Sequence, residues 1–236
     1  MKVSLIILNF KVKDLALKCL ESVKKSNYSE LGIILVDNGS NDGIEEDIKE
    51  LKGVDFIQTG KNLGYSGGNN IGIKRALKSG ADYIFILNPD TTIEKDCIKN
   101  LVDGIEKYKA EITGPKIYFE GTKKIWYAGG IFDKENVIGK HRGVDEVDSG
   151  KYDSPEETDF VTGASLFVKR EVFEKIGLFD EKYFLYYEDA DFCERAKRAG
   201  FNVVYIPDAV VYHENAASAE LGSPLQDYYI SRNRLL

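Results

Sequence analysis

Apolar residues in the first half of the chain alternate between short continuous runs and stripes with helical spacing. The runs are nearly continuous and of strand length, which is typical of parallel strands covered on both faces; they occupy residues 3–8, 33–36, 56–57 and 83–87. The stripes follow the runs and repeat every three or four residues, at Ala16, Cys19, Leu20 and Val23, at Ile44, Ile48 and Leu51, at Ile73, Ala76 and Leu77, and at Ile98, Leu101, Val102 and Ile105. Four such strand–helix units predict a twisted, mostly parallel central sheet flanked by helices.

The second half of the chain has a different pattern. Short β-type runs in residues 117–140 are interrupted by glycines, which predicts a smaller antiparallel excursion. Residues 141–158 hold six acidic side chains and few apolar ones, and we expect an exposed loop there. Further elements are expected as strands at 160–168 and 203–206, and as helices from Glu171 and from about Glu188. Residues 224–236 have the pattern of a helix start, and we expect the chain to stop inside that helix without a cap.

The composition is that of a globular protein. Of 236 residues, 43% are hydrophobic and 30% are charged, which excludes disordered and low-complexity classes. The chain has neither a repeat nor a clean linker, so a single domain over residues 1–236 is expected. The net charge of −7 argues against a general nucleic-acid binder, whose affinity would depend on clustered basic side chains. A small ligand that carries phosphate is still compatible with it, since a metal ion or backbone N–H groups can neutralise that charge locally.

Cysteine use and the N-terminal segment point to the cytoplasm. The three cysteines are far apart, form no CxxC pair and fall on apolar helical stripes, so buried free thiols are expected. The apolar part of residues 1–14 is short and lacks a small-residue cleavage site, so we interpret it as a first strand rather than a signal peptide. No stretch approaches the ~20 apolar residues of a membrane span.

Polar residues follow three of the predicted strands. Asn9 ends the first strand, residues 37–40 (Asp-Asn-Gly-Ser) end the second, and residues 88–90 (Asn-Pro-Asp) end the fourth. Turn chemistry explains any one of these clusters, because Asp, Asn, Gly and Pro all favour turns. Ligands of open α/β sheets bind beyond the carboxyl ends of the strands, so three such clusters at one edge indicate a binding site.

A glycine-rich stretch at residues 61–70 (KNLGYSGGNN) precedes the third helix. Glycines allow the backbone to approach a ligand closely, and the N–H groups of a helix N-terminus can bind phosphate. The stretch is not GxGxxG and follows the third strand rather than the first, so a dinucleotide fingerprint fits poorly. A glycine-rich helix entry without a ligand is the alternative.

An acidic cluster with aromatic neighbours opens a later helix. Glu188, Asp189 and Asp191 follow Tyr186 and Tyr187. Acids in the first turn stabilise a helix through its dipole, which is a sufficient structural reason for them. Partial desolvation beside aromatic rings would also raise a carboxyl pKa toward the range of a general base.

The chain has two histidines. His213 ends a predicted strand, and taken alone it is more typical of a structural role than of a metal ligand. His141 falls in the polar loop and carries no functional signal.

Taken together, these features resemble the inverting family 2 glycosyltransferases, particularly their rhamnosyltransferase-like branch. The matching segments run in order over residues 3–214: IILNF, VDNGSND, NLGYSGGNN, ILNPDTTI, FVTGASLFVKR, GLFDEKYFLYYEDADFCERAKRAGF and VVYHE. The resemblance implies a GT-A fold that binds a nucleotide-diphosphosugar, with residues 1–115 as the nucleotide-sugar-binding half and residues 116–236 as the acceptor-binding and catalytic half. The closing segment also resembles that branch, which usually continues further, so a truncated C-terminus is implied.

The resemblance implies roles for residues at the donor end of the site. Asp37 matches the carboxylate that contacts the nucleotide base, and Asn9 would line the same pocket. Asn62, Gly67 and Asn69 match the loop beside the donor.

The resemblance also implies a metal site and a base. Asp90 corresponds to the last acid of the family's DxD motif, whose first acid is replaced here by Asn88, a neutral oxygen donor. His213 matches a metal ligand, and Mg²⁺ or Mn²⁺ is the implied cofactor. Asp189, the second acid of the pair with Glu188, matches the catalytic base.

The implied activity is transfer of a sugar, with dTDP-rhamnose favoured and a UDP-sugar as the alternative, to a saccharide or lipid-linked acceptor in surface polysaccharide synthesis. Peripheral membrane contact through residues 224–236 is a further expectation, because apolar and aromatic groups stand beside arginines there. Two other function classes are weighed. A sugar nucleotidyltransferase would favour a Gly-rich, basic loop after the first strand, where the chain has residues 9–12 (Asn-Phe-Lys-Val). A nonenzymatic nucleotide-sugar-binding module would have no use for the acid pair.

Overall fold

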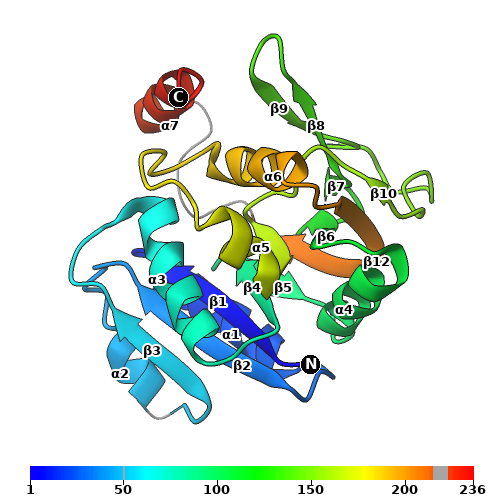
Figure 1. The fold of residues 1–236 in the computed structure, drawn as a ribbon. Helices are drawn as coiled ribbons and strands as arrows, with labels where there is room; N and C mark the ends of the chain where they lie inside the picture. The colour runs from blue at the N-terminus through cyan, green and yellow to red at the C-terminus, as the bar shows by residue number, and fades with distance from the viewer. Residues whose placement is uncertain (50, 215–222) are drawn as a thin grey trace.

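The computed structural model describes residues 1–49, 51–214 and 223–236 and has one large mixed sheet with helices on both faces (Figure 1). The strands of that sheet are β1 (Val3–Asn9), β2 (Leu31–Asp37), β3 (Val54–Gln58), β4 (Tyr83–Leu87), β5 (Thr91–Ile93), β6 (Ile112–Phe119), β7 (Ile125–Tyr127), β10 (Glu156–Glu157), β11 (Ser165–Lys169) and β12 (Val203–His213). A separate antiparallel ribbon consists of β8 (Gly130–Asp133) and β9 (Ile138–His141). The helices are α1 (Lys13–Lys24), α2 (Ile44–Lys49), α3 (Gly64–Lys78), α4 (Cys97–Tyr108), α5 (Arg170–Ile176), α6 (Glu188–Arg198) and α7 (Pro224–Asn233).

The strand order is β10-β12-β6-β11-β4-β1-β2-β3, with β5 beside β12 and β7 beside β6. Strand β1 is parallel to both β2 and β4, and β2 is parallel to β3. Strand β11 runs antiparallel between β4 and β6, and β12 is parallel to β6. The predicted α/β class, a mostly parallel sheet with a smaller antiparallel excursion, is confirmed. The carboxyl ends of β1, β2 and β4 therefore meet at one edge.

The side chains of β1 alternate between two apolar layers. Val3, Leu5 and Ile7 pack in the layer that includes α1, α2 and α4. Ile6 and Leu8 pack in the opposite layer with α3, α5 and α6. Successive strand residues point to opposite faces, so a continuous apolar run is what a strand covered on both sides requires. All three cysteines are free and buried in these layers, as predicted.

A stripe of glycines brings α3 close to β1. Gly64, Gly68 and Gly72 recur every four residues and so share one face of the helix. A Cβ added at Gly68 would lie 2.5 Å from a methyl carbon of Leu8, and one added at Gly72 would lie 2.6 Å from a methyl carbon of Ile6. The stretch 61–70, which we expected to precede the helix, is therefore mostly helix. Glycine at 68 and 72 serves helix-to-strand packing, whereas a Cβ at Gly64 would meet Phe184.

The close approach of α3 to β1 predicts the cost of adding one methyl group. Gly72→Ala should gain about 1 kcal/mol of helix propensity but force Ile6 or the helix to shift, and overpacking typically costs about 1–3 kcal/mol. We expect a net loss of stability, with the melting temperature in thermal denaturation lower by a few degrees. Lys74→Ala, on the exposed side of the same helix, is the control and should change it little. A rise in melting temperature for Gly72→Ala would contradict the packing argument.

Residues 141–158 do not form the simple exposed loop that we expected. Lys116 is 3% exposed, and its ammonium group binds the carboxylates of Asp148 and Asp153. Tyr152 is buried, and its carbonyl accepts a hydrogen bond of 3.0 Å from the hydroxyl of Tyr205. The acidic residues looked like a solvated segment, but part of them neutralises a buried lysine, which would otherwise be costly to desolvate.

The helix predicted from residue 224 is present as α7. Ser223 caps it, accepting a hydrogen bond from the backbone N–H of Gln226, and Pro224 occupies the first turn. The helix ends at Asn233, so the expectation that the chain would stop inside it is wrong. Among the helices of the described residues, none is both long enough and apolar enough to cross a membrane.

Candidate active site

Two neighbouring cavities lie at the carboxyl edge of the sheet. The first, of about 280 Å³, is here named the strand-end cavity and is lined by Leu8, Phe10, Lys11, Val12, Asn38, Asn62, Gly64, Tyr65, Asn88, Pro89, Asp90, Phe184, Leu185 and Leu225. The second, of about 650 Å³, is named the acid-pair cavity and is lined by Tyr65, Asn88, Asp90, Phe119, Trp126, His141, Val144, Asp145, Thr162, Gly163, Ala164, Leu185, Tyr186, Glu188, Asp189, His213 and Gln226. Tyr65, Asn88, Asp90 and Leu185 border both, so the cavities are two parts of one cleft.

Strand pairing brings Asp90 and His213 together. Asp90 directly precedes β5, and Thr91 of β5 is paired with His213 at the end of β12. The Asp90 carbonyl also accepts a hydrogen bond of 2.9 Å from the N–H of Glu214. Two residues 123 positions apart in the sequence are thereby fixed on adjacent backbone segments.

The side chains of Asp90 and His213 meet without satisfying each other. Asp90 Oδ1 lies 3.2 Å from His213 Nε2, and each side chain is 5% exposed. The contact lacks hydrogen-bond geometry, and within the described residues neither Asp90 Oδ1 nor either ring nitrogen of His213 has a hydrogen-bond partner. Buried polar atoms are normally paired, so these converging lone pairs fit a divalent cation. No cluster of three or more His, Cys, Asp or Glu side chains suited to a metal occurs in the described chain. Asp90 and His213 are therefore the two such side chains that the described residues contribute at this point.

A tryptophan separates the two histidines. The Trp126 ring centroid lies 4.3 Å from that of His213 and 4.4 Å from that of His141. His141 Nδ1 is 3.1 Å from the Trp126 carbonyl oxygen, which can only accept, so Nδ1 carries the proton. Burial lowers the pKa of His141 to about 4, so the ring is neutral at neutral pH.

Sequence reasoning missed both Trp126 and His141. His141 was assigned to an exposed loop, but it ends β9, and its pairing with Gly130 of β8 brings it back to the cleft. The available signal was rarity, because the chain has one tryptophan and two histidines. Rarity alone does not reveal that three such residues share one cavity wall.

The acid pair begins α6, and its two members have different surroundings. Asp189 Oδ2 accepts a hydrogen bond of 2.8 Å from the N–H of Gly163, and Oδ1 accepts one of 2.8 Å from the N–H of Ala190. Burial raises the pKa of Asp189, and these N–H groups oppose that rise. Glu188 is 5% exposed, and its Oε2 has no partner within the described residues. Burial, with the neighbouring Asp189 charge added, raises the pKa of Glu188 well above its usual range.

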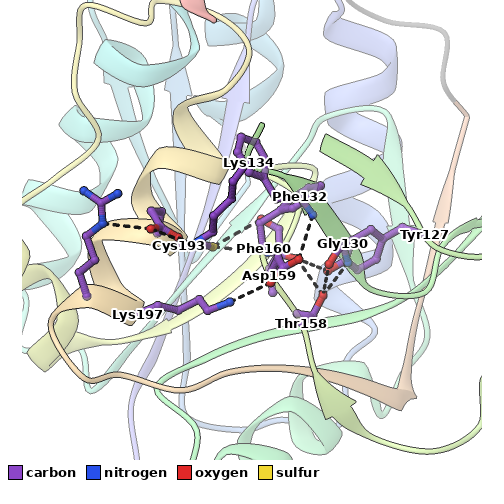
Figure 2. A network of polar contacts seen from close by, with 12 residues as sticks. Tyr127, Gly130, Phe132, Lys134, Thr158, Asp159, Phe160, Cys193 and Lys197 are labelled. Atoms are coloured by element: carbon purple, nitrogen blue, oxygen red, sulfur yellow. Dashed lines mark hydrogen bonds and ion pairs between the residues drawn. The ribbon is translucent and has the colours of Figure 1, made fainter. Parts of the chain in front are cut away.

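The segment at residues 158–163 holds α6 against the ribbon. Figure 2 shows the contacts: Asp159 accepts hydrogen bonds from Lys197 of α6 at 3.0 Å and from the N–H of Phe132 at 2.9 Å. The Cys193 sulfur accepts a hydrogen bond from the N–H of Val161. Both sides of the segment are anchored, which fixes Gly163 and therefore the orientation of Asp189.

Asn9 and Asp37 lie side by side at the ends of β1 and β2, in register with each other. Asn9 Nδ2 donates to Asp37 Oδ1 at 2.8 Å, and Asp37 Oδ2 accepts from Gln58 Nε2 at 2.6 Å. Asp37 is 1% exposed and borders a third cavity, of about 310 Å³, which residues 41–46 and Gln58 also line. The predicted meeting of the two strand-end clusters is confirmed, and Asp37 faces the side of the edge away from Asp90.

The remaining donor-side residues divide into two groups. Asn62 and Asn88 line the strand-end cavity. Gly67 and Asn69 lie inside α3 rather than in a loop, so the expectation that they form a loop is wrong. The first N–H groups of α3 are also used internally: those of Tyr65 and Ser66 donate to the Phe184 carbonyl at 2.6 and 3.3 Å. The expected phosphate site at this helix start is therefore filled by the protein's own backbone.

Comparison with known proteins agrees with this architecture. The family model described as Glycosyl transferase family 2 matches residues 4–177, which is more than half of the chain. The chain belongs to glycosyl transferase family 2.

Curated relatives of this family 2 protein include sugar transferases. It is 29% identical over 236 residues to the low-salt glycan biosynthesis hexosyltransferase Agl10 of Haloferax volcanii, covering 99% of this chain and 74% of the relative. It is 28% identical over 212 residues to the dTDP-rhamnosyl transferase RfbF of Shigella flexneri, covering 86% and 69%. It is 27% identical over 219 residues to an N-acetylglucosaminyl-diphospho-decaprenol L-rhamnosyltransferase of Mycobacterium tuberculosis, covering 84% and 71%.

Solved structures share the fold. GalNAc-T7, solved with UDP, GalNAc and Mn²⁺, has a TM-score of 0.74 at 20% identity, covering 90% of this chain and 44% of that one. The mannosyltransferase PcManGT of Pyrobaculum calidifontis, in complex with GDP-Man and Mn²⁺, has a TM-score of 0.70 at 14% identity, covering 98% and 61%. The family 2 chain thus spans about half the length of these two proteins. The predicted GT-A class is confirmed, and family membership supports a transferase over the two other classes weighed from the sequence.

The buried acid of α6 predicts a pH-dependent difference in stability. Glu188 has a raised pKa in the folded protein, so above about pH 4.3, its unfolded value, the folded state holds the proton more tightly and stability falls as pH rises. Glu188→Gln removes this loss. The free energy of unfolding of the Glu188→Gln protein, minus that of the parent protein, should therefore be larger at pH 8 than at pH 5.

Urea denaturation at both pH values measures the effect of Glu188→Gln. The control is Glu46→Gln, which replaces an exposed acid in the first turn of α2. Its free energy of unfolding should differ from that of the parent protein by the same amount at both pH values. A Glu188→Gln difference that does not depend on pH would mean that Glu188 does not stay protonated in the folded protein.

Proposed function

We propose that this family 2 protein is an inverting glycosyltransferase that moves a sugar from a nucleotide-diphosphosugar to a hydroxyl of a saccharide or lipid-linked saccharide, in the synthesis of a surface polysaccharide. The observation that carries the proposal is the acid-pair cavity, where the unpartnered Asp90–His213 pair and the Glu188–Asp189 pair line the same space. Sugar transfer needs a group that neutralises the leaving diphosphate on one side of the sugar and a base for the acceptor hydroxyl on the other. The Asp90–His213 pair suits the first task, and the Glu188–Asp189 pair suits the second.

The donor is proposed to occupy both parts of the cleft. Its nucleotide would lie at the strand-end side with Asn62 beside it, and the base would extend past this cavity toward Asn9 and Asp37, the latter at the border of the third cavity. Asn88 and Asp90 border both cavities, which suits them to the junction between diphosphate and sugar. Gly67 and Asn69 lie in α3, the helix that contributes Gly64 and Tyr65 to the strand-end cavity. Their proposed role is to support the donor site from within this helix. Relatives named for dTDP-rhamnose and L-rhamnose transfer support dTDP-rhamnose, with a UDP-sugar as the alternative.

Asp90 and His213 are proposed to hold Mg²⁺ or Mn²⁺. The metal, when bound, would supply Lewis-acid neutralisation of the leaving diphosphate. One carboxylate and one imidazole leave most coordination positions for diphosphate oxygens, water and the neutral oxygen of Asn88. Two fold neighbours solved with Mn²⁺ support a divalent ion.

Asp189 is proposed as the base. As the acceptor oxygen attacks the anomeric carbon, the bond from that carbon to the diphosphate oxygen breaks, and the acceptor's proton passes to Asp189. A single displacement of this kind inverts the anomeric centre. The N–H groups of Gly163 and Ala190 fix the orientation of the carboxylate. Glu188 would lie beside this base, and its raised pKa favours the neutral acid over a second negative charge.

Membrane contact through residues 224–236 stays a prediction. Leu225, Tyr228 and Leu235 expose between 51% and 88% of their surface, which supplies apolar area for a lipid-linked acceptor.

The metal assignment predicts metal-dependent donor binding. Calorimetry with nucleoside diphosphate should give tight binding with Mn²⁺ or Mg²⁺ and much weaker binding after EDTA. Asp90→Ala should weaken metal-assisted binding at least tenfold, because it removes the single carboxylate of the pair. Asp208→Ala, an exposed acid in β12, is the control and should bind like the parent protein. Equal affinity with and without metal would remove both Asp90 and His213 from a metal role.

The base assignment predicts a loss of rate with little loss of binding. Asp189→Asn should reduce transfer about 10²- to 10⁴-fold while donor affinity stays within a few fold, because a positioned base acts in the transition state. Asp191→Asn is the control from the same helix turn; it loses an ion pair with Arg195 and should affect mainly stability. Steady-state kinetics decides the assignment, and an Asp189→Asn protein with most of its turnover intact would exclude Asp189 as the base.

A further inference from the structure

The segment that leads into the acid pair has an unusual backbone. Phe184, Tyr186 and Tyr187 have φ angles of 61°, 70° and 71°, a left-handed region that bulky side chains rarely adopt. They are three of the four residues that precede Glu188, the first residue of α6. Conformations of this kind persist only where surrounding contacts hold them, and they concentrate at functional sites.

A single amide from α7 contacts most of this segment. Asn233 is 3% exposed, and its Nδ2 lies 2.9, 2.8 and 2.7 Å from the carbonyl oxygens of Tyr183, Leu185 and Tyr186. Its Oδ1 accepts a hydrogen bond of 2.8 Å from Arg232 Nε. The amide therefore cannot rotate without losing hydrogen bonds on both of its ends.

Other contacts hold the same segment between two helices. Arg232 donates to the Tyr183 carbonyl at 2.8 Å, and the Tyr229 ring stacks on the Phe184 ring with centroids 5.1 Å apart. From the other side, the Phe184 carbonyl accepts from the N–H groups at the start of α3. Figure 1 shows α7 beside the loop that precedes α6.

We propose that Asn233 is a positioning residue for the acid pair: it holds residues 183–187 in the backbone conformation that starts α6 and aims Asp189 into the acid-pair cavity. The role of Asp189 in this statement rests on the proposed function. The Tyr187 backbone immediately precedes the helix, so a change there would turn the first helical turn and move Asp189 from the N–H of Gly163. A displacement of about 1 Å is enough to cost on the order of 10²-fold in rate.

A purely structural role for Asn233 makes different predictions. If the amide only attached α7 to the protein, its loss would affect α7 and leave residues 183–190 and the chemical step as they are. A positioning role requires that the segment before α6 loosens and that kcat falls more than donor affinity.

The test uses Asn233→Asp, which keeps the shape but replaces the donor with oxygens that face three carbonyls. The control is Ser231→Ala, on the exposed side of the same helix. Hydrogen exchange should become faster in peptides covering residues 183–193 and stay unchanged in β1 and β2. With the donor and acceptor, kcat should fall about 10- to 100-fold while the calorimetric Kd for the donor changes less than threefold. Ser231→Ala should match the parent protein in both measurements.

Two outcomes would overturn the proposal. Unchanged exchange at residues 183–193 would exclude positioning whether or not the protein transfers sugar, so this arm is independent of the proposed function. Unchanged kcat in an active protein with faster exchange would show that the segment does not control the base. If Asn233→Asp fails to fold, Tyr229→Leu is the second variant, because it removes the ring stack on Phe184 and leaves the amide in place. It should give a smaller rise in exchange at residues 183–193 and a smaller fall in kcat. Unchanged exchange together with unchanged kcat in this variant would overturn the proposal.

Discussion

The pairing of β5 with the end of β12 is the constraint on which the cleft depends. It joins a strand of the first half of the chain to the last strand of the second half, and it places Asp90 beside His213. Between β4 and β12 the sheet inserts β11 and β6, so the two halves share one set of backbone hydrogen bonds. The cleft is therefore a property of the whole sheet rather than of a loop attached to it.

The same cleft concentrates groups that weaken a fold. Glu188, Asp90 and His213 are buried with polar atoms that have no hydrogen-bond partner in the described chain. Each such atom costs free energy, and proteins keep a few of them where function requires it. The surrounding sheet, with apolar layers on both faces, provides the stability that offsets these atoms.

Local patterns predicted the elements, because strand and helix periodicity depend on residues close in the sequence. The alternation of strands with helices then predicted a parallel sheet and its carboxyl edge. The meeting of Asn9 with Asp37 followed from that edge. The glycine run at residues 61–70 was misread as a segment that precedes the helix, although Gly64 and Gly68 are four residues apart, a spacing that places them on one helix face.

Long-range contacts set the limit of what the sequence could predict. His141 reaches the cleft through its pairing in the β8–β9 ribbon, which the acidic composition of its segment concealed. Asn233 binds carbonyls 47 to 50 residues away, and the buried Lys116 neutralises acids 32 and 37 residues away. Patterns within a short stretch of sequence do not reveal partners this far apart. The roles of Asp189 and His213 stay predictions, and both lie outside the matched range 4–177.

The glycine face of α3 has a consequence for how donor preference could change over evolution or in engineering. Because the glycine backbone of α3 touches the side chains of β1, the part of the strand-end cavity that Leu8 and Gly64 line tolerates little change in side-chain volume. Leu225, which lies on the surface helix α7 and is half exposed, also borders this cavity. New nucleotide or sugar selectivity would therefore be acquired most easily at Leu225, while the glycine face and the held segment 183–187 stay constant.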